Sequence, residues 1–149
     1  MTPHVIIITK EEKMLVAPLV DCNGFDERSK VLRIIAKKLL KNNVSVDATI
    51  SVAEAWMSKV KDAKKDFTMP SKDPNRNEVL MVSAIDSEEN YITWMYSIIR
   101  KGSEVSLVSM EDEIEILNKW VKKDEEKGIF DNMLLDAFWS EYKSNCIST

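Results

Sequence analysis

The stretch that decides the fold runs from Glu78 to Val108 and reads EVLMVSAIDSEENYITWMYSIIRKGSEVSLV. It consists of apolar runs joined by short polar links, with the runs at residues 78–85, 91–99 and 104–108. Runs of this length that are rich in β-branched and aromatic residues predict strands. Because links this short carry no crossover, we expect neighbouring strands to be antiparallel. The run at 91–99 is apolar on both faces, which predicts a central, covered strand.

Two further strands are predicted upstream. The β-branched run His4–Thr9 indicates a short strand. Residues 46–56 alternate with period two, which indicates a half-buried strand. The side chains expected on its buried face are Val46, Ala48, Ile50, Val52 and Trp56, and those expected on its solvent face are Ser45, Asp47, Thr49 and Ser51.

Residues 10–22 allow two interpretations. Thr9 and Glu12 have the spacing of a capping box, which favours a helix that begins at Lys10. Pro18 would interrupt that helix, and an extended segment is the alternative.

Helices are predicted at the flanks. Asp26–Lys41 carries an apolar stripe along one side and ends at Asn42 and Asn43. Residues 110–144 predict a C-terminal helical hairpin, with a first helix that begins after Ser109 and a last helix capped by Asp131. Grouped strands with flanking helices predict the α+β class. We expect one domain over residues 1–149, with an antiparallel meander of four or five strands and helices mainly on one face.

The composition excludes several classes of site. The chain has 149 residues, a net charge of −4, 1 His, 2 Cys and 3 scattered Gly. A zinc tetrad and a glycine-rich phosphate loop therefore have no source of ligands, and we expect no metal or cofactor. Cys22 and Cys146 are expected as reduced thiols, with a bridge between them as the alternative. No long apolar run is present, so we expect a cytoplasmic protein that does not contact membranes.

Glu54 is the first candidate for a functional residue. By the alternation of the strand it lies on the apolar side, between Val52 and Trp56. A carboxylate there has to be paired or have a raised pKa, and acid–base catalysis uses such groups. The alternatives are a strand that ends at Ala53, a bulge that switches the face, or a salt bridge to Arg76.

The loop from Pro70 to Glu78 is the second candidate. It holds Asp73, Arg76 and Glu78 within a segment restricted by two prolines. Arg76 could bind a carboxylate or phosphate in bidentate fashion, or could latch the loop to the sheet together with Glu78.

Aromatic and basic residues supply weaker signals. Most of the tryptophans are expected in the core, although Trp139 next to Phe138 suggests that one of these two is exposed. Two lysine clusters, at residues 37–41 and 59–65, are expected to be solvated faces, with nucleic-acid binding as the alternative.

One resemblance rests on residues 45–82. The strand that ends in Glu54-Ala55-Trp56 and the following motif from Pro70 to Glu78 resemble a family of small, uncharacterised microbial and phage-associated proteins. The resemblance implies no activity. It directs attention to Glu54, Trp56, Asp73, Arg76 and Glu78.

Three functions are consistent with these observations. We expect a small soluble binding or regulatory protein that acts through protein–protein contacts, with a protein partner or a homodimer. A hydrolase-like acid–base enzyme that uses Glu54 with Asp73 and Arg76 is the alternative, with Trp56, Arg76 and Glu78 in binding roles. A nucleic-acid accessory protein is the second alternative.

Overall fold

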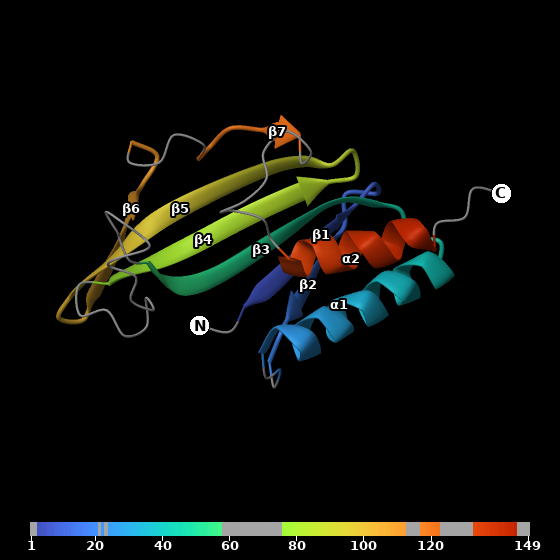
Figure 1. Cartoon of the computed structure of the whole chain (residues 1–149), viewed down its shortest axis with the longest axis horizontal. Coiled ribbons are helices and arrows are strands. Elements are labelled where there is room, and N and C mark those ends of the chain that lie inside the picture. The colour runs from blue at the N-terminus through green and yellow to red at the C-terminus, as the bar shows by residue number, and fades with distance from the viewer. Residues whose placement is uncertain are drawn as a thin grey trace, which may run out of the picture.

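A computed structural model describes residues 3–20, 22, 24–57, 76–112, 117–122 and 133–145. These residues form a 7-stranded antiparallel sheet and the helices α1 (Gly24–Lys41) and α2 (Met133–Ser144). Both helices lie on the same side of the sheet and pack against each other (Figure 1). The predicted α+β class is confirmed, and the sheet has more strands than the four or five expected.

The strands follow one another with short connections in the second half of the sheet. Their order is β2-β1-β3-β4-β5-β6, and β7 also pairs with β5. Their bounds are β1 (His4–Thr9), β2 (Met14–Pro18), β3 (Val46–Met57), β4 (Asn77–Asp86), β5 (Asn90–Lys101), β6 (Glu104–Ser109) and β7 (Val121–Lys122). The predicted meander is therefore present from β3 to β6. β1 joins it as the neighbour of β3, with β2 as the outer strand.

Residues 10–22 hold an edge strand, not a helix. The Thr9 N–H donates to the Lys13 carbonyl at 2.9 Å, and the Lys13 N–H donates to Thr9 Oγ1 at 3.1 Å. The hydroxyl that could cap a helix therefore closes the hairpin between β1 and β2. Pro18 is the last residue of the edge strand β2, a position where a missing N–H is tolerated.

Helix α1 has the sequence features of a stable amphipathic helix. Acidic residues occupy its first turn and basic residues its last, as the helix dipole favours. Leu32, Ala36 and Leu39 are its buried apolar residues. Asn43 adopts a φ of 56° just after the helix, and the Val44 N–H then donates to the Leu39 carbonyl at 2.9 Å. The predicted end at Asn42 and Asn43 is confirmed.

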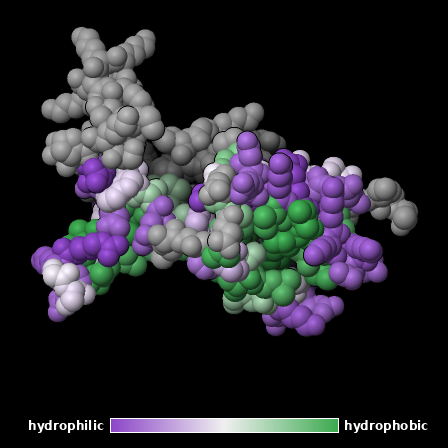
Figure 2. Space-filling view, turned by 90° about the horizontal axis from the view of Figure 1, so that it is seen from below, coloured by the Kyte–Doolittle hydropathy of each residue, from purple (hydrophilic) through white to green (hydrophobic). Residues whose placement is uncertain are grey.

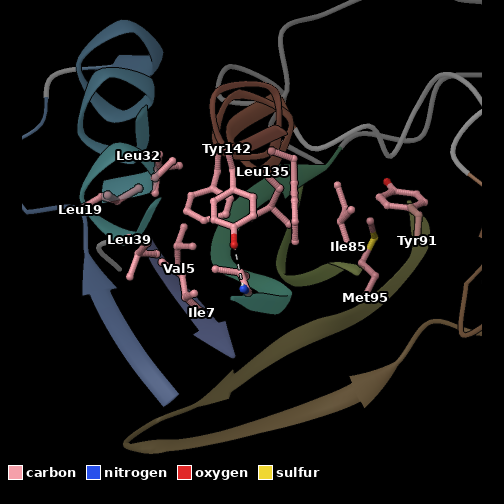
Figure 3. Packing of buried hydrophobic residues seen from close by; sticks show 14 of the residues in the cluster. Val5, Ile7, Leu19, Leu32, Leu39, Ile85, Tyr91, Met95, Leu135 and Tyr142 are labelled. Atoms are coloured by element: carbon pink, nitrogen blue, oxygen red, sulfur yellow. Dashed lines mark hydrogen bonds between the residues drawn. The ribbon is translucent and has the colours of Figure 1, made fainter. Parts of the chain in front are cut away.

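The core lies between the helices and the sheet face that carries the odd-numbered residues of β3 (Figure 3). Thr49 is 0% exposed and Ser51 is 5% exposed, so the face expected toward solvent is the one that the helices cover. The predicted orientation of this strand is wrong from Ala48 onward, whereas Val46 is buried and Asp47 is exposed as expected. Val5 and Ile7 of β1 pair with Ser51 and Thr49 and bring apolar side chains to the covered face. The hydroxyl of Thr49 is accommodated there because it accepts the Trp139 indole N–H at 2.8 Å and donates to the Ile85 carbonyl at 3.3 Å.

Helix α2 is anchored by aromatic side chains that all point into this core. Phe138 and Trp139 are 0% and 5% exposed, so the expectation that one of them is exposed is wrong. Their rings meet edge to face with centroids 5.5 Å apart. The Tyr142 hydroxyl donates to the Val44 carbonyl at 2.8 Å and accepts the Val46 N–H at 3.1 Å. Tyr142 thus ties α2 to the start of β3.

Residues 117–122 do not form the first helix of the expected C-terminal hairpin, so this prediction is wrong for them. The Asn118 N–H donates to the Thr93 carbonyl at 2.9 Å, and Val121 pairs with Tyr91 in the sheet. β6 pairs only with residues Tyr96 to Lys101 of β5. The N-terminal half of β5 therefore has backbone groups on this edge that β6 does not pair with. Residues 117–122 occupy them, so long-range pairing prevails over local helical periodicity. The capping residue Asp131 lies outside the described residues.

Candidate binding surface

The candidate residues lie where β3 ends and β4 begins, on the sheet face opposite the helices, which we call the far face. Trp56 pairs directly with Glu78, and Glu54 pairs with Leu80. Leu80 in turn pairs with Tyr96 of β5. Because directly paired residues share a face and the face alternates along a strand, Arg100 lies on the far face as well. The antiparallel meander therefore brings together residues from three strands.

Arg100 and Glu78 form a bidentate ion pair across β4 and β5. Arg100 Nε donates to Glu78 Oε2 at 2.8 Å, and a terminal guanidinium nitrogen donates to Oε1 at 2.7 Å. The hydrogen bonds from Arg100 hold the pKa of the Glu78 carboxyl below its ordinary value. Paired hydrogen bonds of this kind fix the plane of the guanidinium. Arg100 is half exposed, so its outer edge is presented to solvent in a fixed position.

Trp56 and Arg76 form the second contact of this surface. Trp56 is 45% exposed, and the Arg76 guanidinium carbon lies 4.3 Å from the centre of its ring. This distance is that of a cation–π contact. Arg76 directly precedes β4, so the register of Trp56 with Glu78 brings the two side chains together.

Glu54 lies next to this pair and is half-buried. Its negative charge contributes to raising the pKa of Arg100, after the larger contributions of the hydrogen bond and the charge of Glu78. β3 continues through Met57 in unbroken register, so the alternatives of an end at Ala53 or a bulge are wrong. The face that carries Glu54 is not the face beneath the helices. The premise of a carboxylate buried in the core is therefore wrong.

We call the set of Glu54, Trp56, Arg76, Glu78 and Arg100 the Trp56 patch. Asp73, the remaining candidate, lies outside the described residues. Arg100 is the member that was not predicted from the sequence. The signal was available in the turn, because the hairpin at residues 86–90 sets the register of β4 against β5 and so brings Arg100 near Glu78.

The two lysine clusters are the other surfaces that the sequence indicated. In the first lysine cluster, Lys37 Nζ lies 3.2 Å from Glu141 Oε1. A guanidinium nitrogen of Arg33 lies 3.8 Å from Glu141 Oε2. The second cluster, at residues 59–65, lies outside the described residues.

In the described part of the chain, no three His, Cys, Asp or Glu side chains come together as metal ligands. None of the helices among those residues is long and apolar enough to cross a membrane. Cys22 is a free, partly buried thiol.

The remaining tryptophans divide between core and surface. Trp139 is buried, Trp94 is half-buried on the far face, and Trp120 is 57% exposed beside β7. The expectation that most tryptophans serve as core anchors is therefore wrong. Trp56 and Trp120 are the exposed pair, and only Trp56 lies among charged residues of the far face.

These features define an α+β protein with helices on one face of an antiparallel sheet and an aromatic, charged patch on the other. A family model described as bacteriophage lambda protein ea47 matches residues 3–121, from before β1 to the start of β7. The chain belongs to this family. The resemblance of its sequence to a phage-associated family is thereby confirmed. No curated protein and no solved structure gives a match to the chain.

Proposed function

We propose that this protein is a binding protein without catalytic activity, and that it contacts another protein through the Trp56 patch. The observation that carries the proposal is the exposed Trp56 ring with the Arg76 guanidinium stacked 4.3 Å from its centre. Tryptophan and arginine are the residue types that most often dominate the energy of protein interfaces. A stacked pair loses little conformational freedom when a partner covers it.

The surroundings of this pair support the same reading. Arg100 is held in place by Glu78, so a second guanidinium is oriented before a partner arrives. Val105 pairs with Arg100 and Leu107 pairs with Ile98, so both share the far face. They are 57% and 51% exposed and extend the apolar part of the surface toward β6. An apolar centre with a charged rim is the usual anatomy of an interface.

The charges of the patch also support a binding role for Glu78. The patch contains two carboxylates and two guanidinium groups, so it presents no net charge. The pKa of Glu78 is lowered by Arg100, so Glu78 stays ionised at neutral pH and serves an ion pair better than proton donation. We therefore infer a protein partner whose surface offers both an apolar side chain for Trp56 and a carboxylate for a guanidinium.

Site-specific photo-crosslinking tests this proposal. A photoreactive phenylalanine analogue replaces Trp56 in one variant and Trp120 in the control, since Trp120 is 57% exposed but lies outside the patch. In lysate from the source cells, we expect a discrete crosslinked protein from position 56 and none from position 120. The crosslink should disappear with the additional change Arg76→Ala. Equal crosslinking from both positions, or none from position 56, would contradict the proposal.

A further inference from the structure

The strand β6 is an unusually accessible edge of the sheet. All six of its residues are exposed, and in the described part of the chain it pairs with β5 alone. Val105, Leu107 and Val108 are each more than half exposed. Hydrophobic side chains reach the surface at this end of the molecule and again over α1 (Figure 2).

Edge strands of monomeric proteins usually carry devices that prevent pairing with other chains. Such devices are lysine, proline, a bulge or an inward-pointing charge. The sequence of β6 is EVSLVS, with no lysine or proline, and its register with β5 has no shift. Its single charge is Glu104, at the end next to the turn. The edge therefore presents aliphatic side chains at three of its six residues and lacks a lysine, a proline or a bulge.

The backbone of this edge is oriented for an added strand. The Met110 N–H donates to the Met95 carbonyl at 3.0 Å, so Met110 directs its N–H toward β5. In an antiparallel ladder this direction alternates along the strand. Val105, Leu107 and Ser109 therefore direct their N–H and C=O groups away from β5. A row of unpaired N–H and C=O groups along an edge is a template for pairing with another strand.

We propose that a second copy of this chain pairs its β6 antiparallel to this edge, about a two-fold axis at Ser106. In this register Val105 lies opposite Leu107 of the second copy, and the converse pair follows by symmetry. Both residues have the correct backbone direction, so the two copies exchange main-chain hydrogen bonds at each pair. Their side chains share the far face, so four aliphatic side chains form one cross-strand cluster.

The distribution of charge favours a second copy of this chain, over an unrelated strand, as the partner of the β6 edge. The turn between β5 and β6 carries the exposed residues Lys101 and Glu104, whereas the exposed residues Glu111 and Asp112 follow the opposite end of β6. The two-fold register about Ser106 places Lys101 of each copy opposite Glu111 of the other. The two acidic ends stay apart. A parallel arrangement would place the two acidic ends together.

This pairing uses the backbone edge of β6 with Val105 and Leu107, whereas the proposed function rests on the stacked pair of Trp56 and Arg76. The dimer therefore goes beyond the proposed function, and variants of Trp56 distinguish the two. The two sheets would become one, with both Trp56 patches on the same continuous face. The variant Trp56→Ala should leave dimerisation unchanged, which separates the two proposals experimentally.

A disulfide trap tests the register most sharply. In a background with Cys22→Ser and Cys146→Ser, the variant Ser106→Cys places the two introduced thiols opposite each other at the axis. Opposed residues at this type of position have Cα atoms about 4.5 Å apart, within the range of about 4.4–6.8 Å for disulfides. Glu104→Cys is the matched control, because its two copies would be about 14 Å apart along the strands. Under mild oxidation, we expect a covalent dimer from the first variant and not from the second.

Sedimentation of the unmodified full chain provides the second measurement. We expect a reversible dimer of twice the 17.1 kDa chain mass. Leu107→Lys should weaken dimerisation by about tenfold or more, because it buries a charge in the aliphatic cluster. Ile34→Lys, on an exposed position of α1, should have no effect. A monomer at all concentrations, or a dimer for which Ser106→Cys and Glu104→Cys crosslink equally, would overturn the proposal. If Leu107→Lys fails to fold, the disulfide experiment with Ser106→Cys and Glu104→Cys tests the proposal.

Discussion

The orientation of β3 can be tested by a single buried hydroxyl. Thr49→Val keeps the shape of the side chain but removes the acceptor of the Trp139 indole N–H and the donor to the Ile85 carbonyl. Thr49 is 0% exposed, so water cannot replace these partners in the folded protein. Leaving a buried donor without a partner costs about 1–3 kcal/mol, and the gain from the added methyl group offsets part of it. We expect a net loss of about 2 kcal/mol in the free energy of unfolding.

Thermal and chemical denaturation would measure this loss. For a chain of this length, such a change lowers Tm by about 6 °C. In a double-mutant cycle with Trp139→Phe, which removes the donor, Thr49→Val should cost markedly less than it does alone. The matched control is Val52→Thr on the far face, which should cost less than Thr49→Val. If Thr49→Val were neutral or stabilising and Val52→Thr were the damaging change, the helices would cover the other face and the described core would be wrong.

Three further predictions concern the sheet and its surfaces. The stabilisation from the Glu78–Arg100 pair should be present at neutral pH and should be lost as the pH falls below about 4, because the folded pKa of Glu78 is lowered; denaturation of Glu78→Gln should show a weaker pH dependence in this window. Gly102 has a φ of 62°, so Gly102→Ala should cost about 1 kcal/mol and should lower Tm, whereas a neutral result would contradict the described turn. Fluorescence anisotropy with a labelled oligonucleotide should show no binding at physiological salt, and tight, salt-sensitive binding would revive the nucleic-acid alternative.

Local patterns predicted the parts of the fold whose partners are close in sequence. The meander from β4 to β6 follows from short polar links, and α1 follows from its apolar stripe and its asparagine end. The local patterns gave wrong predictions at two segments that pair as strands. Thr9 has the spacing of a helix cap but closes a hairpin with Lys13, because β1 offers Met14–Pro18 a strand to pair with. Residues 117–122 have helical periodicity but pair along the free half of β5.

The candidate surface was predicted in part. Trp56, Arg76 and Glu78 were selected by residue type and spacing, and the structure brings them together at one end of the far face. The interpretation of Glu54 as a carboxylate in the core was wrong, because it assumed which face the helices cover. Arg100 was missed because its pairing with Glu78 depends on the register between two strands. Asp73 lies outside the described residues, so its role stays a prediction.

The sequence by itself determined the class of fold, the antiparallel order of β4 to β6 and the residue types of the surface patch. These follow from periodicity, link length and turn chemistry, which are local properties. Only the tertiary structure decided which face of the sheet forms the core. The covered face of β3 carries Thr49 and Ser51, but the neighbouring strands bring Val5, Ile7 and Ile85 to the same face. The hydroxyl of Thr49 is accommodated there because it accepts the indole N–H of Trp139, which lies 90 residues away in the chain.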